Sequence, residues 1–151
     1  MTHSYDFDHF TDKRRRAEIQ RLHQQANVML GRELRLLRTL GLAPQHHFLE
    51  VGCGPGFLTG AVATLIPQGR AVGLDLSSEM MAVARAVVAP EHPNLGFEQG
   101  SAYELPFPDD SFDFLYSRLV YQHLADPLAA LAEARRVVKP GGRVVVLDID
   151  D

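Results

Sequence analysis

A cluster of glycines directly after a short apolar segment is the feature that most limits how this chain can fold. His47–Val51 has the composition of a buried strand, and Gly52, Gly54 and Gly56 follow it before a helical pattern begins. Glycine permits positive φ, and its missing Cβ allows a ligand to lie directly against the backbone. Open parallel sheets bind ligands beyond the carboxyl ends of their strands. The cluster therefore predicts a strand–turn–helix unit that binds a ligand at the turn.

The rest of the chain alternates between strand and helix patterns. Helices are predicted over about Asp12–Leu40, Phe57–Leu65, Ser78–Val88 and Pro127–Val138, and strands over His47–Val51, Arg70–Asp75, Leu95–Gln99, Phe112–Tyr116 and Arg143–Ile149. Strands separated by helices favour parallel pairing through right-handed crossovers, so the expected class is α/β with a doubly wound sheet. Gly31 leaves two possibilities open for the first segment, one helix or two helices with a bend near that residue.

The composition describes one ordinary folded domain. The 151 residues are 46% hydrophobic and 23% charged, which excludes disordered and fibrous classes. No apolar run approaches the roughly 20 residues that span a bilayer, and the N-terminal residues are too polar for a signal peptide. Cys53 is the only cysteine, which excludes an internal disulfide and a thiolate zinc site, and no metal is expected. These features predict a cytoplasmic protein.

The charge of the chain argues against a polyanionic partner. The net charge is −4, which is small and of the wrong sign for a surface that binds nucleic acid or an anionic membrane. Residues 1–47 carry +3 and residues 48–151 carry −7. The basic cluster Lys13–Arg16 is interpreted as the solvated first turn of a helix.

An acid after the second strand narrows the class of ligand. Asp75 ends that strand 23 residues after Gly52, about the distance at which such folds place an acid on ribose hydroxyls. The dinucleotide fingerprint requires a third glycine where this chain has Phe57. Glu50 would repel a pyrophosphate, whereas its carboxylate suits a ligand with an ammonium or sulfonium group.

Two segments resemble the first two motifs of class I S-adenosylmethionine (SAM) dependent methyltransferases, Glu50-x-Gly52-x-Gly54-x-Gly56 and Gly73-Leu-Asp75-Leu-Ser77. The resemblance covers about residues 45–150. It continues, in the family's order and spacing, in Gln99–Ala102, Leu105–Phe107, Asp110–Asp113, Ser117–Pro127 and Arg136–Gly142. The chain most resembles the small-molecule branch that includes the quinone-biosynthesis methyltransferases.

The resemblance implies a Rossmann-like sheet with strand order 3-2-1-4-5. It implies a SAM-binding core over residues 45–151, preceded by an N-terminal helical leader or lid over residues 1–44. The implied activity is transfer of a methyl group from SAM to a small-molecule acceptor by in-line displacement. Two alternatives stay open, a non-catalytic SAM-binding module and an NAD(P)-dependent oxidoreductase, although Phe57 and Glu50 disfavour the latter.

The resemblance also implies roles for the residues around the turn. Gly52 and Gly54 would pass under the methionine part of the cofactor, and Gly56 completes the set of cofactor-binding glycines. Glu50 would lie near the cofactor's amino group. Asp75 would accept hydrogen bonds from both ribose hydroxyls.

Further cofactor contacts are implied downstream. Leu76 and Met80 would pack against adenine, and the backbone N–H of Ala102 would point to the ring. Ser101 stands where the family usually has an aspartate that bonds the adenine amino group, which predicts weaker adenine binding. The last two implied contacts, beside the methionine carboxylate and the reactive sulfur, are Ser117 and Arg118.

Several of these residues also have a purely structural interpretation. Glu50 could cap the following turn, Met80 could belong to the core, and Cys53 could be a small residue tolerated in a tight turn. Ser77 is a favourable helix N-cap whatever the function. Arg118 could form a surface ion pair, with either Asp126 or Asp113.

No catalytic residue is assigned firmly. If the acceptor must lose a proton, the weak candidate is His123, with Tyr121 and His23 as further possibilities. The first helix and its aromatic leader, Tyr5, Phe7 and Phe10, could form a lid over the acceptor or merely cover the sheet.

The resemblance breaks at the C-terminal side. The family's sheet has seven strands, the last two forming a hairpin, whereas this chain ends directly after the fifth. We expect a truncated chain, or a sheet completed by another chain. Val144–Leu147 would then form an exposed apolar edge, through which the protein could form a homo-oligomer.

Overall fold

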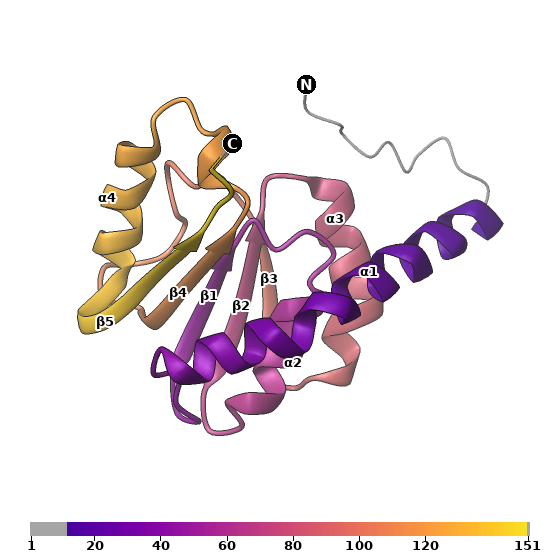
Figure 1. Cartoon of the computed structure of the whole chain (residues 1–151), viewed down its shortest axis with the longest axis horizontal. Helices are drawn as coiled ribbons and strands as arrows, with labels where there is room; N and C mark the ends of the chain where they lie inside the picture. Colours follow the sequence, from indigo (N-terminus) through magenta and orange to yellow (C-terminus); the bar gives the residue numbers. More distant parts are fainter. Residues whose placement is uncertain (1–11, 151) are drawn as a thin grey trace.

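The computed structural model describes residues 12–150 and folds them into a parallel sheet between two layers of helices (Figure 1). The helices are α1 (Asp12–Thr39), α2 (Phe57–Leu65), α3 (Ser78–Val83) and α4 (Pro127–Val137), and the strands are β1 (His47–Val51), β2 (Arg70–Asp75), β3 (Leu95–Gln99), β4 (Phe112–Arg118) and β5 (Val138–Leu147). All four strand pairs are parallel, in the order β3-β2-β1-β4-β5. The predicted fold class and strand order are confirmed.

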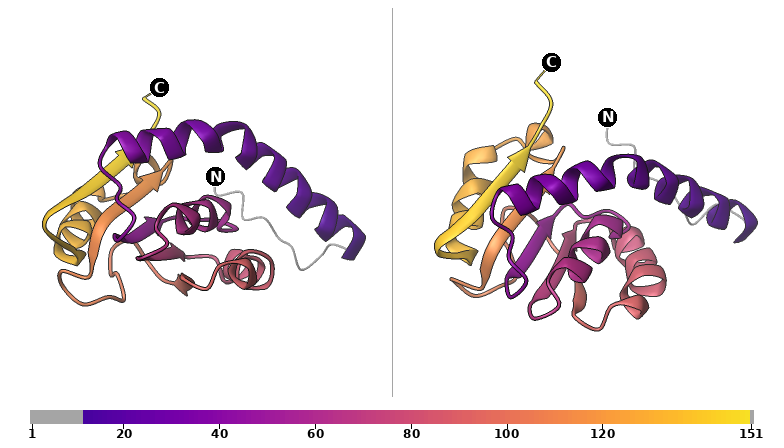
Figure 2. Two further views of the ribbon diagram at one scale, coloured as in Figure 1. Left: turned by 90° about the horizontal axis from the view of Figure 1, so that it is seen from below. Right: turned by 60° about the horizontal axis from the view of Figure 1, so that its bottom comes forward.

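The central strand β1 is buried on both faces. Phe48 and Leu49 have no exposed surface, as expected for a strand between two covered faces of a parallel sheet. One face packs against α1, α2 and α3, and the other against α4 (Figure 2). The strand order reverses at β1, between β2 and β4, so the carboxyl end of β1 lies at the switch point of the sheet.

Helix α1 runs without a break from Asp12 to Thr39, so only the one-helix possibility at Gly31 holds. A Cβ at Gly31 would have no neighbour within 4 Å, so the glycine serves no close contact. Tertiary packing around it offsets its low helix propensity, because Leu30, Leu34 and Leu37 all pack against the core. The N-terminal part of α1 extends past α3 (Figure 1).

Strand β5 ends at Leu147 and not at the predicted Ile149, helices α1 and α4 each end one residue before their predicted ends, and three further boundaries also differ. The helix expected over Ser78–Val88 is α-helical only to Val83, and a π-helical turn continues it over Ala84–Val88. Strand β4 extends to Arg118. Strand β5 begins at Val138 rather than at Arg143. Its register against β4 shifts between Phe112 and Phe114 of β4, because residues 139–142 of β5, which include two glycines, bulge there.

Strand β5 forms one edge of the sheet. Within residues 12–150 it pairs only with β4. Val144 is 38% exposed and Leu147 is 40% exposed, whereas the two valines between them are half-buried. The apolar edge predicted from the sequence is therefore present in the described part of the chain.

Candidate functional site

The turn between β1 and α2 adopts a backbone that favours glycine. The φ angles of Gly52, Gly54 and Gly56 are 76°, 54° and 85°, all in the left-handed region. The backbone N–H groups of Gly52 and Cys53 donate to the carbonyl of Leu74 at 2.7 and 3.0 Å. These bonds hold the turn against the end of β2.

The three glycines have different surroundings. A Cβ at Gly52 would lie 2.2 Å from Cγ2 of Val120, and one at Gly56 would lie 2.4 Å from the ring of Phe97. A Cβ at Gly54 would have no neighbour within 4 Å. Gly52 and Gly56 therefore allow close packing of the protein with itself, and Gly54 presents bare backbone to open space.

Asp75 lies directly behind this turn. Its Oδ2 accepts a hydrogen bond from the backbone N–H of Gly54 at 2.9 Å, and its Oδ1 accepts one from the N–H of Ser77 at 2.9 Å. The hydroxyl of Ser77 accepts from the N–H of Met80, so the predicted N-cap of α3 is confirmed. A carboxylate has lone pairs beyond these two bonds and can accept further hydrogen bonds from a ligand.

Glu50 is a nearly buried carboxylate at the end of β1. Its side chain is 5% exposed, and its Oε1 accepts a hydrogen bond from the hydroxyl of Thr59 at 2.7 Å. Burial raises the pKa of Glu50 to about 7, the Thr59 hydrogen bond opposes this increase, and the nearby Glu33 carboxylate adds to it. The capping alternative is wrong, because the partner is a side-chain hydroxyl of α2 and not a backbone N–H of the turn.

A pocket of about 390 Å³ lies between the turn, the end of β4 and helix α1. It brings together four of the predicted site residues, Glu50, Gly52, Gly54 and Arg118. Helix α1 contributes Gln25, Ala26, Leu30 and Glu33 to its wall. The volume lies within the usual range for small-molecule sites.

Sequence reasoning missed Glu33. This carboxylate is 5% exposed, and its Oε1 forms an ion pair with Nε of Arg118 at 3.1 Å and accepts a hydrogen bond from the hydroxyl of Tyr116 at 3.0 Å. Glu33 lies on the apolar stripe of α1, one helical turn from Leu30 and from Leu37. A charged residue on such a stripe is a signal that could have revealed it.

The ion pair with Glu33 shows that neither of the two surface partners predicted for Arg118, Asp113 and Asp126, pairs with it. Asp113 pairs with Lys139 at 3.4 Å, and its pKa is lowered by the backbone N–H of His47 and by Lys139, which together outweigh its partial burial. Asp126 caps α4 by accepting from the N–H of Ala129. Arg118 therefore faces the pocket with Glu33 and not the surface with either aspartate.

The other predicted cofactor residues do not line this pocket. Leu76 is 71% exposed, and Met80 is partly buried and packs against the core on the face of the sheet that α1, α2 and α3 cover. The hydroxyl of Ser101 accepts from the N–H of Tyr103, and Ala102 packs against the cluster on the α4 face. Ser117 is fully buried, and its hydroxyl donates to the carbonyl of Val51 at 2.8 Å. The side chain of Ser117 thus holds β4 to β1.

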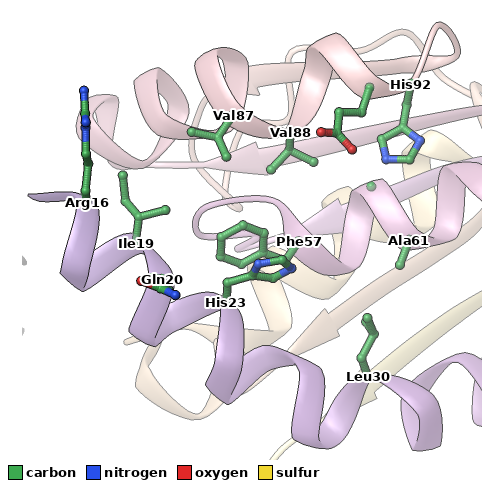
Figure 3. A pocket seen from close by; sticks show the side chains of 12 residues that line it. Arg16, Ile19, Gln20, His23, Leu30, Phe57, Ala61, Val87, Val88 and His92 are labelled. Atoms are coloured by element: carbon green, nitrogen blue, oxygen red, sulfur yellow. The ribbon is translucent and has the colours of Figure 1, made fainter.

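The three candidate proton acceptors lie outside the pocket as well. His123 is exposed, and its Nε2 lies 3.2 Å from Nε2 of Gln122. Tyr121 is 4% exposed, its hydroxyl has no partner within residues 12–150, and burial raises its pKa to about 12. His23 stacks on Phe57, with ring centroids 4.6 Å apart, in a second, mostly apolar pocket between α1, α2 and residues 87–92 (Figure 3). Phe57 lines both pockets.

Cys53 has a structural place in the turn. Its side chain is 7% exposed, and burial raises the pKa of its thiol, which makes it a poor nucleophile.

Within the described residues, no group of three or more histidine, cysteine or acidic side chains could hold a metal ion. No helix of residues 12–150 combines the length and the apolar character that crossing a bilayer requires.

The doubly wound sheet, the bare glycine turn at its switch point and the acid behind it define a Rossmann-like α/β protein. Residues 49–146 match the sequence model of a family described as "Methyltransferase domain". The chain belongs to this family, which confirms the family predicted from the sequence.

Named relatives support this membership. The chain is 40% identical over 109 residues to an uncharacterized methyltransferase of Schizosaccharomyces pombe, covering 68% of this chain and 39% of the relative. It is 38% identical over 113 residues to the demethylmenaquinone methyltransferase of Lysinibacillus sphaericus, covering 74% and 48%. The chain thus spans less than half the length of these curated relatives.

Solved structures show the same fold. The crystal structure of a SAM dependent methyltransferase from Aquifex aeolicus superposes with a TM-score of 0.77 at 25% identity, covering 87% of this chain and 71% of that one. The YcgJ protein from Bacillus subtilis superposes with a TM-score of 0.70 at 33% identity, covering 81% and 50%.

Proposed function

We propose that this chain is the cofactor-binding part of an enzyme that transfers a methyl group from SAM to a small-molecule acceptor. The observation that carries the proposal is the bare backbone of Gly54, which faces open space while its N–H is held by the Asp75 carboxylate. Membership of the methyltransferase family and the similarity to a SAM dependent methyltransferase from Aquifex aeolicus support it.

The charges around the turn suggest how the cofactor lies. Its methionine part occupies the pocket beside Gly54, with the ammonium group near Glu50 and the carboxylate near Arg118. Its ribose hydroxyls donate to Asp75, which keeps acceptor capacity after its two backbone bonds. Its adenine extends out of the pocket toward the carboxyl ends of β2 and β3, where Leu76 and Met80 follow β2 and Ser101 and Ala102 follow β3.

The bound cofactor supplies an electrophilic methyl group on a positively charged sulfur. The chain's task is then to hold the two reactants in line and to exclude water, which can supply about 7 to 11 kcal/mol of barrier reduction. Gly54 and the pocket walls position the donor, and Ser117 contributes by holding β4 to β1. Where the acceptor must lose a proton, His123 stays the proposed proton acceptor, because it follows β4 at the same end of the sheet.

We assign the N-terminal region the role of a lid. The wall that α1 gives to the pocket supports this role, since Gln25, Ala26, Leu30 and Glu33 all line it. The same helix also covers the sheet through Leu37, which is fully buried, so both functions predicted for this helix are compatible. The aromatic leader, Tyr5, Phe7 and Phe10, lies outside the described residues.

The acceptor class rests on composition and on one relative. The relative from Lysinibacillus sphaericus is a demethylmenaquinone methyltransferase, which supports a small-molecule acceptor here. The net charge of −4 disfavours nucleic acid as a partner.

The free, buried Cys53 suits a cytoplasmic location, and the apolar edge of β5 suits a homo-oligomer.

Calorimetry with S-adenosylhomocysteine (SAH), the product left by SAM, and with NADH tests the cofactor class. We expect SAH to bind and NADH not to bind, because Glu50 repels a pyrophosphate and the third fingerprint glycine is replaced by Phe57. Binding of NADH with no heat from SAH would favour an oxidoreductase instead. A product screen with labelled SAM and quinol-like acceptors then separates an enzyme from a module that only binds SAM.

Replacement of Asp75 tests the ribose contact. Asp75→Ala should weaken SAH binding by about 1.5 to 3 kcal/mol, because the ligand hydroxyls lose a charged acceptor. Asp75 also bonds Gly54 and Ser77, so loss of affinity alone does not isolate the contact. The 2′-deoxy analogue of SAH isolates it: its missing hydroxyl should cost affinity in the original chain and cost none in Asp75→Ala. Equal costs in both proteins would refute the ribose contact.

A further inference from the structure

The pocket beside Gly54 holds more negative than positive charge. Among the described residues 12–150, its charged lining residues are the carboxylates of Glu33 and Glu50 and the guanidinium of Arg118. Both carboxylates are 5% exposed. Asp75 adds a further carboxylate behind the turn, 2.9 Å from the backbone nitrogen of Gly54. One guanidinium balances only one of these acids, so above about pH 7, where Glu50 is mostly ionised, the site favours a ligand with net positive charge.

Glu33 is the acid that belongs to none of the recognised motifs. It reaches the pocket from α1, and its Oε1 takes both the ion pair with Arg118 and the hydrogen bond from Tyr116. No hydrogen bond to its Oε2 is found within residues 12–150, and the residue lines the pocket. Glu33 therefore both fixes the guanidinium of Arg118 and leaves a second carboxylate oxygen for a cation in the pocket.

We propose that Glu33 makes this site selective for the positively charged methyl donor over its neutral product. The inference rests on the proposed function. SAM carries a carboxylate, an ammonium and a sulfonium group and has one net positive charge. When the bond from sulfur to methyl breaks and the methyl bonds the acceptor, the electron pair stays on sulfur, and SAH has no net charge. The excess negative charge that Glu33 supplies attracts SAM more than SAH and promotes release of the product.

The variant Glu33→Gln removes this charge and retains an oxygen that can accept the Tyr116 hydroxyl. Calorimetry on the full chain measures the dissociation constants of SAM and SAH in one preparation. We expect SAM affinity to fall about tenfold and SAH affinity about twofold, so the preference for SAM falls about fivefold. A SAM analogue in which a protonated amine replaces the sulfonium should follow SAM. If the variant is partly unfolded, the apparent affinities for SAM and SAH fall by the same factor, so the ratio of the two dissociation constants is unchanged.

Two further variants serve as controls. Glu98→Gln changes the net charge equally, but Glu98 is exposed on β3 and does not line this pocket, so it should leave the preference unchanged. Glu33→Asp retains the charge and should keep most of the preference. Equal losses of SAM and SAH affinity in Glu33→Gln would show a purely structural role and overturn the inference.

The outcomes also separate this inference from the proposed function. An original chain that binds neither SAM nor SAH overturns both. An original chain that binds both ligands, with a preference that Glu33→Gln leaves unchanged, overturns only the role of Glu33. If Glu33→Gln does not fold, the inference is tested by measuring how SAM binding and SAH binding by the original chain depend on salt concentration. SAM binding should then weaken with salt more steeply than SAH binding, and equal slopes contradict the inference.

Discussion

The variant Gly54→Val is expected to abolish cofactor binding while the chain still folds. Gly54 has a φ of 54°, and a Cβ there would meet no atom within 4 Å, so a side chain can leave the backbone there without a clash at its Cβ. The branched side chain would instead fill the space above the turn that the ligand needs. We expect SAH affinity to fall by at least about 100-fold, or roughly 2.7 kcal/mol, in calorimetry.

The strain of a non-glycine residue at this φ requires a matched control. Gly141 has a φ of 81°, and a Cβ there also meets nothing within 4 Å, but it lies in the bulged segment of β5 away from the pocket. Gly141→Val should cost a similar amount of stability, about 1 to 2 kcal/mol, and leave SAH affinity intact. If folded Gly54→Val binds SAH as tightly as Gly141→Val does, the turn is not the binding site.

The sheet was predictable because its strands carry strong local signals. Strands β1 and β2 are buried on both faces, so their residues form nearly continuous apolar runs that end in glycine or in an acid. Strand β5 was harder, because Pro140, Gly141 and Gly142 have the local signal of a turn. The pairing of Val138 with Phe112 extends the strand across that segment, and only the neighbouring strand determines this pairing.

The candidate site was predictable in its backbone and less so in its side chains. Three similar glycines in the sequence predicted a turn, but only the positions of Val120 and Phe97 show which of them faces open space. Asp113 and Asp126, the two partners predicted for Arg118, lie near it in the sequence. Glu33 lies far away along the chain, and the packing of α1 on the sheet brings it to Arg118. Sequence spacing carries no signal for such a contact.

The variant Glu50→Gln is expected to stabilise the cofactor-free protein against unfolding and to weaken SAM binding. Burial raises the pKa of Glu50 from 4.5 to about 7, and the facing charges of Glu33, Asp75 and Arg118 modify it. The native state therefore binds this proton more tightly than the unfolded state, and stability is lost as the pH rises from about 4.5 through about 7. Above that range the ionised carboxylate costs about 3 kcal/mol.

Glutamine removes this cost because it has no charge and can still accept the Thr59 hydroxyl. Thermal unfolding at about pH 8 should show Glu50→Gln several degrees above the original chain, with the difference vanishing at about pH 4. The exposed Glu98→Gln should show no such pH-dependent gain. SAM affinity should fall in Glu50→Gln, because the ammonium group loses its carboxylate. A destabilised Glu50→Gln at about pH 8 would mean that the carboxylate serves the fold. Higher stability with weaker binding would mean that the chain retains a buried charge for its ligand at the expense of its own stability.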